Sequence, residues 1–374
     1  GVREPDFNEL PFARMVAERW GTCHYEDILQ PDVVTTLPEM IWHMEEPVDP
    51  FAMGVFAVAR LASRHVKVVL GGDGGDEIFA GYDRYFGNLI VDLYSLIPRP
   101  LRRMVIEPLI HRLPDSYSYN NRVQKLKWLA AMSESSAGVR YGNSASYLRF
   151  SHAHKQALYT PQLWQQFANV DSIEHLLHYF NASNAEDVVD KMLYTDTRTR
   201  LAEHLLAVND RMTMAFSIEG RSPLVDQKMV EFAATLPTHF KLRGRRLKYI
   251  QHRLAHEYLP EPLLRRKKQG FSFPLAYWFR NELYPVVKQL FENSRLAETG
   301  YMRKESMLSM LDEHRSGRMD HNYRLWLLLN LEIWQRQLID QEPVDKLVEM
   351  LRQPFDVLGR NELSVTPSLN SIAP

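Results

Sequence analysis

Cysteine is almost missing from the 374-residue sequence. Cys23 is the only one, which excludes a disulfide framework and a zinc site built from several thiolates. A single unpaired thiol is typical of a reducing compartment, so the sequence predicts a cytoplasmic location. Long apolar runs are missing too. No stretch approaches the roughly 18 consecutive apolar residues of a transmembrane helix, so we expect no membrane-spanning segment.

An excess of basic residues is also lacking. Lys and Arg total 45 and Asp and Glu total 46, which leaves a formal net charge of −1. A protein that coats nucleic acid needs a strong basic excess, so no nucleic-acid partner is predicted. Hydrophobic residues make up 45% of the chain and charged residues 24%, which indicates a globular protein rather than a disordered one.

The first quarter of the chain predicts α/β organisation. Apolar spacing predicts helices over 9–20, 37–45 and 57–64. A β-branched run at 66–70 predicts a buried parallel strand, and a helix over 76–86 is expected after a cluster of glycines. Helix, strand, glycine loop and helix in succession indicate an α/β unit, to which we assign residues 1–98.

Beyond Pro98 the apolar spacing is almost entirely helical. The clearest helices are expected over 201–215, 226–236, 247–258, 285–292 and 323–338, with Asp226 as an N-cap. We therefore predict a mainly helical part over 99–352. Residues 353–374 carry scattered polar residues and prolines without a sustained period, which predicts a loosely ordered tail.

The most informative segment runs from Leu70 to Tyr82. It contains four glycines within five positions, Gly71, Gly72, Gly74 and Gly75. Glycines between a strand and a helix let the main chain approach a ligand closely, and exposed N–H groups at such a turn form an anion site. The Gly-Lys-[Ser/Thr] ending of a Walker A loop is absent, and so is the glycine spacing of dinucleotide-binding loops.

Three carboxylates accompany these glycines, namely Asp73, Asp76 and Glu77. Carboxylates this close raise one another's pKa unless a cation lies among them. A hard divalent ion with oxygen ligands, usually Mg²⁺ shared with phosphates, resolves the conflict. The alternative is an acidic first helical turn that interacts favourably with the helix dipole.

The segment resembles the second signature of glutamine-dependent asparagine synthetases, usually Ser-Gly-Glu-Gly-[Ser/Ala]-Asp-Glu followed by a glycine-tyrosine turn. Two further blocks carry the resemblance onward. Residues 210–226 are similar to the family's D-R-M-S-M-A…E-x-R-x-P-F-L-D block, and Arg266–Phe271 resembles its R-x-K-x-G-F block. The three motifs occur in the family's order, and the resemblance covers most of the chain, from about residue 5 to about residue 340.

The resemblance implies an adenine-nucleotide α-hydrolase-like (ATP-pyrophosphatase) fold, with a parallel sheet followed by a large helical portion. It also implies a carbon–nitrogen ligase that uses ATP, Mg²⁺, L-aspartate and ammonia from a glutaminase domain, usually as a homodimer. The family's Ser-Gly-Gly-x-Asp-Ser phosphate loop and its N-terminal glutaminase domain have no counterpart in the sequence. We therefore expect an incomplete synthetase domain that is inactive by itself.

The resemblance also implies roles for single residues. Asp76 would hold Mg²⁺, and Asp73 would face the acyl-adenylate, where it orients ammonia or takes a proton from it. Gly71, Gly72, Gly74 and Gly75 would bind the nucleotide. Lys268 would supply the cation of the adenylation transition state, with Lys267 as the alternative register.

Four charged residues in the second block, Asp210, Arg211, Glu219 and Arg221, are expected either to form a buried ion-pair network that shapes the site or to contact a ligand. Glu219 and Arg221 cannot face each other on a helix because they are two positions apart, so separate partners are expected. The basic run from Lys241 to Lys248 is interpreted as a solvated face.

The glycine loop departs from the family pattern at two positions. Gly71 replaces the usual serine, and Asp73 replaces the usual glutamate. The second departure keeps open a related ligase that amidates a different carboxylate, such as a sugar acid. The missing phosphate loop keeps open a non-catalytic interaction module.

Overall fold

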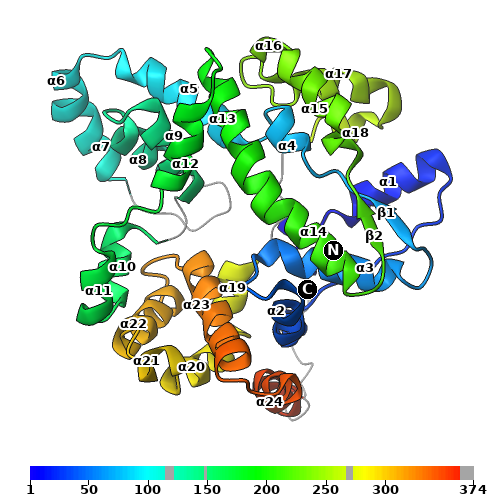
Figure 1. The fold of residues 1–374 in the computed structure, drawn as a ribbon, viewed down its shortest axis with the longest axis vertical. Coiled ribbons are helices and arrows are strands. Elements are labelled where there is room, and N and C mark those ends of the chain that lie inside the picture. Colours follow the sequence, from blue (N-terminus) through cyan, green and yellow to red (C-terminus); the bar gives the residue numbers. More distant parts are fainter. Residues whose placement is uncertain (114–121, 147–149, 267–272, 363–374) are drawn as a thin grey trace, which may run out of the picture.

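The computed structural model describes residues 1–113, 122–146, 150–266 and 273–362. Within these ranges the chain is mostly helical, with one small parallel sheet (Figure 1). None of the helices described is both long enough and apolar enough to cross a membrane.

The first three helices follow the expected order. Helix α1 (Leu10–Trp20) ends at Gly21, whose left-handed φ of 60° closes the last turn. Helix α2 (Leu37–Met44) follows a short 3₁₀ turn. Helix α3 (Pro50–Ala62) begins seven residues earlier than expected, because the Asp49 side chain accepts a hydrogen bond from the Phe51 N–H and Pro50 suits a first helical position.

Strand β1 (Val68–Leu70) pairs in parallel with β2 (Glu219–Arg221), with Val68 opposite Glu219 and Leu70 opposite Arg221. The predicted parallel pairing is therefore confirmed, but the predicted burial is wrong. The side chain of Leu70 is 73% exposed and that of Val68 40%. Only one face of the strand pair packs against helix α14 (Leu206–Met214), so apolar side chains on the other face stay in solvent.

The single helix expected over 76–86 is wrong. A short helix α4 (Gly75–Ile78) ends after one turn, and α5 (Asp83–Ser95) begins only after Tyr82. Between them Ala80 adopts a left-handed φ of 57°, and the Gly81 N–H returns to the Asp76 carbonyl at 2.8 Å. The chain thus folds back on the glycine loop instead of continuing as a helix.

The helices beyond residue 98 form three successive groups along the chain. The first comprises α6 (Arg99–Leu101), α7 (Glu107–His111), α8 (Arg122–Met132), α9 (Ala137–Ser146), α10 (His152–Leu158), α11 (Pro161–Phe167), α12 (Glu174–Ala182) and α13 (Val188–Asp196). The second comprises the π-helical η4 (Thr197–Leu205), α14, α15 (Gln227–Thr235), α16 (Thr238–Lys241), α17 (Tyr249–Tyr258) and α18 (Glu261–Leu264). The third comprises α19 (Leu275–Arg280), α20 (Tyr284–Glu292), α21 (Arg295–Glu298), α22 (Lys304–Arg315), α23 (Asn322–Trp334), η6 (Gln335–Ile339) and α24 (Val344–Glu362).

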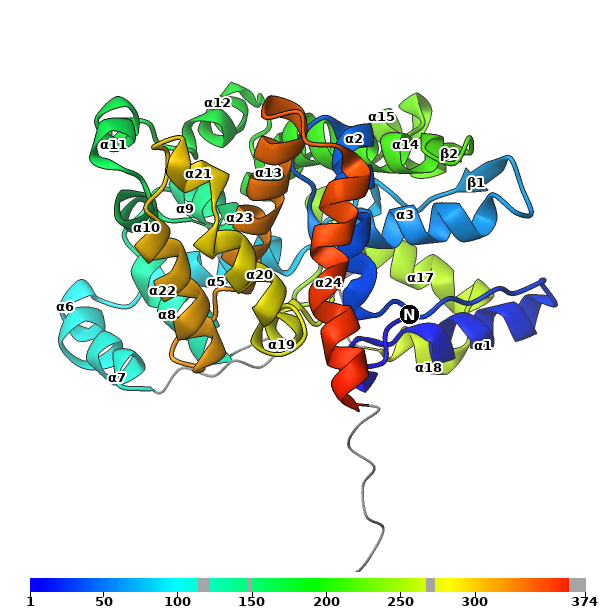
Figure 2. The same cartoon turned by 90° about the horizontal axis from the view of Figure 1, so that it is seen from below.

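The five clearest helices of the sequence analysis are confirmed to within a few residues, and Asp226 caps α15 by accepting from the Lys228 N–H. Helix α24 continues to Glu362, into the stretch for which a loose tail is expected. Figure 2 shows α24 as a long rod beside α2 and α20. Residues 363–374 lie outside the described part of the chain.

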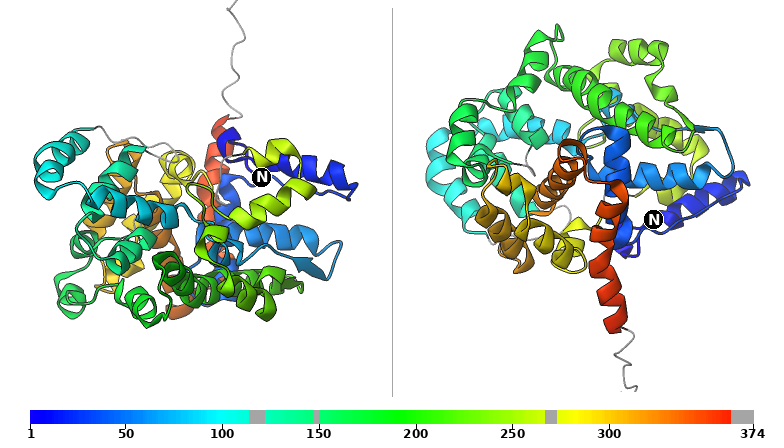
Figure 3. Two further views of the ribbon diagram at one scale, coloured as in Figure 1. Left: turned by 90° about the horizontal axis from the view of Figure 1, so that it is seen from above. Right: turned by 60° about the horizontal axis from the view of Figure 1, so that its bottom comes forward.

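The largest apolar core joins α2, α3 and α14 to the C-terminal helices α19–α24. Segments far apart in sequence therefore share one interior, with Trp278 and Trp326 fully buried. The rod formed by α13, η4 and α14 crosses the molecule, and the sheet lies beside its α14 end (Figures 1 and 3). This rod supports the glycine loop.

Candidate functional site

The candidate site lies where β1 and β2 end together. Because parallel strands present their carboxyl ends at one edge, the glycine loop after β1 meets the segment after β2. The Gly71 N–H donates to the Arg221 carbonyl at 2.7 Å, which extends the ladder by one residue into the loop. Asp73 and Ser222 thereby reach hydrogen-bond distance although they are 149 residues apart.

The four loop glycines divide into two pairs. Gly71 and Gly75 already use their N–H groups within the chain, toward Arg221 and toward the Gly72 carbonyl at 3.3 Å. No main-chain partner is described for the N–H groups of Gly72 and Gly74. Gly74 has a φ of 84°, and a Cβ there would come within 2.8 Å of Val225. A Cβ on Gly72 would meet no atom of the described residues within 4 Å, so this part of the loop is open on their side.

The Asp73 carboxylate is held by two neutral donors. The Asn209 Nδ2 and the Ser222 Oγ each donate to its Oδ2 at 3.0 Å. Asn209 comes from α14 and Ser222 from the turn after β2, so three segments converge on one oxygen. Spacing in the sequence gave no signal for either donor.

Asp76 lies beside a lysine that the sequence analysis assigned to a solvated face. The Lys248 Nζ lies 3.0 Å from the Asp76 Oδ1, and Lys248 has a left-handed φ of 49° at the start of α17. Gly81 makes this approach feasible, because a Cβ there would overlap the Asp76 carboxylate at 1.8 Å and the Lys248 side chain at 2.3 Å. The Asp76 carboxylate and the Lys248 side chain thus occupy a space that a Cβ at position 81 would fill.

Glu77 points inward and is 1% exposed. The Tyr82 hydroxyl donates to its carboxylate, and the Arg200 Nε donates to that hydroxyl at 3.2 Å. Burial is the main cause that raises the pKa of Glu77, while the Tyr82 hydrogen bond opposes the rise. Burial likewise raises the pKa of Tyr82. Glu77 therefore belongs to the support beneath the loop rather than to its open side.

The same support continues into α5 and α13. Arg84 and Tyr85 both donate to the Asp196 carboxylate, which is 2% exposed. The Arg84 guanidinium also lies over the Tyr82 ring, 4.3 Å from its centre. These contacts fix the turn at 79–82 that returns the chain to the glycine loop.

The expectation of one cation among three carboxylates is therefore wrong in its geometry. Asp73 faces α14 and β2, Asp76 faces Lys248, and Glu77 faces the interior. Within the described ranges no group of three or more His, Cys, Asp or Glu side chains surrounds a metal position. Of the three carboxylates, Asp76 is the one that lies beside a cationic group, the Lys248 ammonium.

The four charged residues of the second block do not form a buried network. Asp210 and Arg211 lie exposed on α14, where Arg211 donates to the Met44 carbonyl and lies 3.8 Å from the Glu45 carboxylate. Glu219 and Arg221 lie on β2 rather than on a helix, and the Arg221 Nε donates to the Glu219 Oε1 at 2.8 Å. Residues two apart share a face of a strand, so the expectation of separate partners is wrong.

The basic run is only in part a solvated face. Lys241 is 3% exposed, and its Nζ lies 2.9 Å from the Asp190 carboxylate. Lys248 contacts the loop, as described above. The other basic candidates, Lys267 and Lys268, lie outside the described residues together with most of the R-x-K-x-G-F block.

Comparison with known proteins agrees with the motifs. The sequence model of the family described as asparagine synthase matches residues 1–336. The chain is 28% identical over 362 residues to glutamine-hydrolyzing asparagine synthetase 1 of Bacillus subtilis, covering 96% of this chain and 54% of that protein. It is 31% identical over 356 residues to a putative glutamine-hydrolyzing asparagine synthetase of Mycobacterium bovis, covering 93% and 52%.

A more distant relative is the amidase chyE of Penicillium rubens, 23% identical over 327 residues that cover 79% of this chain and 46% of that protein. The chain spans about half the length of the curated relatives it matches. With a family match over 336 of its 374 residues, the chain belongs to the asparagine synthase family.

Proposed function

We propose that the chain forms the synthetase part of a glutamine-dependent asparagine synthetase, which activates aspartate with ATP and then transfers ammonia to it. The observation that carries the proposal is the glycine loop in a chain of this family. Two of its N–H groups have no described main-chain partner, and they lie beside two carboxylates with separate supports. Such a loop suits a polyphosphate next to a reacting carboxylate.

In the first step, an aspartate carboxylate oxygen attacks the α-phosphorus of ATP and pyrophosphate leaves. The N–H groups of Gly72 and Gly74 would donate to phosphate oxygens, and Lys248 would add positive charge nearby. Lys268, the candidate outside the described residues, stays proposed as a second cation. Phosphoryl chemistry of this kind depends on positioning and charge more than on covalent help from the protein.

Asp76 fits a magnesium ion as one carboxylate ligand, because Mg²⁺ is commonly bound by one or two carboxylates together with substrate phosphates. The Lys248 ammonium, 3.0 Å from the Asp76 Oδ1 in the room that Gly81 leaves, supports this fit, because a cation already lies beside this carboxylate. Bound there, the ion would neutralise charge on the pyrophosphate. Lys248 would then turn from Asp76 toward the phosphates.

In the second step, ammonia attacks the carbonyl carbon of the acyl-adenylate and AMP leaves. Asp73 would orient the nitrogen and accept one of its protons. The short side chain at this position also supports the second candidate, a ligase that amidates another carboxylate.

The finer fold is part of the proposal. Strands β1 and β2 are parallel, and Val68 and Leu70 leave one face of the pair apolar and exposed. Parallel sheets are normally covered on both faces, so this face suits further elements of an adenine-nucleotide α-hydrolase-like sheet. The cytoplasmic location is proposed from the single unpaired cysteine, and the homodimer from the family resemblance.

ATP–pyrophosphate exchange in the full-length protein tests the proposal. Exchange that requires L-aspartate supports asparagine synthesis. Exchange that requires a different carboxylate, such as a sugar acid, supports the same adenylation reaction with a substrate other than aspartate. No exchange with any carboxylate contradicts the proposal and favours a non-catalytic module.

A further inference from the structure

Asn209 is a buried side chain that reaches out of its helix toward the glycine loop. It is 9% exposed, and its amide lies between β2 and Asp73. A Cβ on Gly220 would lie 3.1 Å from the Asn209 Oδ1 and 3.1 Å from the Thr213 Oγ1. The Thr213 hydroxyl is already bonded to the Asn209 carbonyl at 2.8 Å. Gly220 therefore leaves the room that the amide occupies.

A second glycine makes room on the loop side. A Cβ on Gly71 would lie 2.6 Å from the Asp73 Oδ2, which is the oxygen held by Asn209 and Ser222. The carboxylate thus folds back over Gly71 into a position that both donors define. Gly71 thus leaves room for the Asp73 Oδ2, Gly220 leaves room for the Asn209 amide, and Asn209 and Ser222 both donate to this oxygen.

The two hydrogen bonds leave the carboxylate with a defined direction. Both reach Oδ2, and in the described part of the chain no donor reaches Oδ1. The donors are neutral, so they orient the group without placing a permanent positive charge against it. A carboxylate held in this way can present Oδ1 to an incoming nitrogen.

We propose that Asn209 and Ser222 are positioning residues for the amide-forming step, which they serve by directing the Oδ1 of Asp73 toward the attacking nitrogen. The inference rests on the proposed function. In that step the nitrogen lone pair forms the C–N bond, the bond from carbon to the AMP oxygen breaks, and its electron pair leaves with AMP. One proton passes from nitrogen to Oδ1. Adenylation does not use this proton transfer, so it needs neither donor.

The test separates the two half-reactions in the full-length protein. In Asn209→Ala and Ser222→Ala, ammonium-dependent amide formation should fall about 10- to 100-fold in kcat, whereas ATP–pyrophosphate exchange should stay within about twofold of the wild type. The KM for ATP should also be unchanged. Ser222→Thr keeps the hydroxyl and should restore most of the lost rate. Asn281→Ala, an exposed asparagine bonded to its own helix, is the matched control and should change neither reaction.

Equal losses in both half-reactions, with no rescue by Ser222→Thr, would show a merely structural role and overturn the inference. Unchanged amide formation in both alanine variants would overturn it as well. Failure of the wild type to exchange pyrophosphate with any carboxylate would overturn the proposed function and this inference together. The wild-type exchange thus distinguishes the two failures.

Discussion

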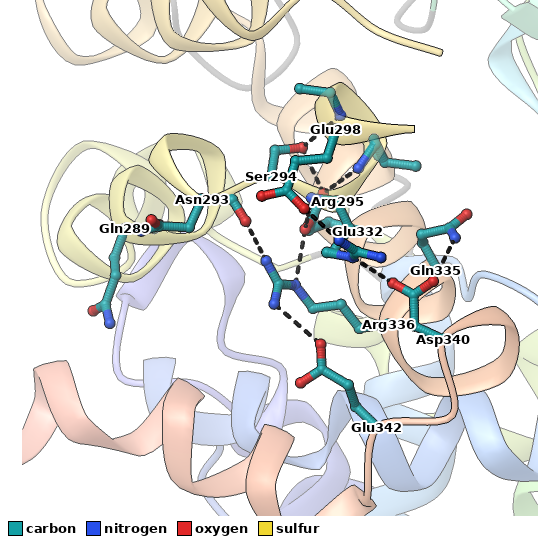
Figure 4. A network of polar contacts seen from close by, with 12 residues as sticks. Gln289, Asn293, Ser294, Arg295, Glu298, Glu332, Gln335, Arg336, Asp340 and Glu342 are labelled. Atoms are coloured by element: carbon teal, nitrogen blue, oxygen red, sulfur yellow. Dashed lines mark hydrogen bonds and ion pairs between the residues drawn. The ribbon is translucent and has the colours of Figure 1, made fainter. Parts of the chain in front are cut away.

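The glycine loop and the corner between α21 and α23 both bring acidic and basic side chains together, but they use them differently. At the corner, the Glu332 carboxylate is fully buried and accepts hydrogen bonds from the Ser294 Oγ, the main-chain N–H groups of Arg295 and Leu296, and the Arg336 Nε (Figure 4). In the loop, Asp73 accepts from two side chains onto one oxygen.

The corner is closed on its basic side too. Arg336 donates to the Asn293 carbonyl and, at 3.2 Å, to Glu342, while the Arg295 Nε donates to Asp340 at 2.7 Å (Figure 4). Every charged group drawn there has a partner within the protein, and Glu332 also satisfies the first N–H groups of α21. Such a network holds the helices together, because its charged groups are satisfied by one another and by main-chain groups.

The difference lies in what remains open. In the described part of the chain, no donor reaches the Oδ1 of Asp73 and no main-chain acceptor reaches the N–H groups of Gly72 and Gly74. The loop is also open beside Gly72, where a Cβ would meet no described atom within 4 Å. Charge density alone does not separate a binding site from a structural ion-pair network. The count of satisfied donors and acceptors does.

Glu332→Ala should give the largest effect on stability. It leaves Arg336 buried without its closest carboxylate, and breaking a buried pair typically costs about 3–5 kcal/mol. Urea unfolding should show this loss, whereas Glu349→Ala, an exposed change on α24, should cost less than about 0.5 kcal/mol. A cost below about 1 kcal/mol for Glu332→Ala would contradict the structural role of the corner.

Asp76→Asn should give the largest effect on activity. It removes the proposed magnesium ligand, so ATP–pyrophosphate exchange should fall about 10²–10³-fold, equivalent to about 3–4 kcal/mol at the barrier. Stability should change by less than about 1 kcal/mol, because the Asp76–Lys248 pair is partly exposed. Asp345→Asn on α24 is the control. Exchange at the wild-type rate in Asp76→Asn would contradict a role of Asp76 in binding magnesium.

His321 should make the C-terminal helices sensitive to acid. Burial lowers the pKa of His321 from 6.5 to about 4, while Glu313 opposes the shift. The unfolded chain therefore takes up a proton between these two values and the folded protein does not, so stability should fall as the pH drops from about 6.5 to about 4. Urea titrations at several pH values should show a shallower fall in His321→Gln. An equal fall in both proteins would assign the acid sensitivity elsewhere.

Glu77 should give the smallest effect, and in the opposite direction. Because burial raises the pKa of Glu77 in the folded protein, the folded state holds a proton that the unfolded state releases first. Stability should therefore fall as the pH rises from the ordinary glutamate value of 4.5 through the raised pKa. Glu77→Gln, which keeps the shape, should flatten this fall in the same urea titrations. An unchanged slope would contradict burial as the cause.

Much of the secondary structure follows from local signals. Gly21, Asp226 and the apolar spacing of α14, α15 and α23 predict their helices to within a few residues. The break at Ala80 was missed because it depends in part on Lys248, which is distant in sequence, lies beside Gly81 and donates its N–H to the Ala80 carbonyl at 3.4 Å. The exposure of Leu70 was missed because a β-branched run predicts a strand but not what covers it.

Only the part of the site that lies within the glycine-loop motif could be predicted from the sequence. The loop glycines, Asp73 and Asp76 stand together in sequence, so spacing finds them. Asn209, Ser222 and Lys248 reach them from 136, 149 and more residues away, and only the parallel pairing of β1 with β2 and the packing of α14 and α17 bring them close. The pairing of Glu219 with Arg221 was missed because this segment was treated as a helix, and residues two positions apart share a face only on a strand.

The central claim is that this loop activates a carboxylate by adenylation. It is tested most directly by following ¹⁸O from carboxyl-labelled L-aspartate in the full-length protein with ATP, Mg²⁺ and ammonium. We predict that one labelled oxygen appears in the phosphate of AMP and none in pyrophosphate, since the carboxylate oxygen that attacks the α-phosphorus leaves with AMP. Cleavage of ATP without label in AMP, or formation of ADP and phosphate, would contradict the account.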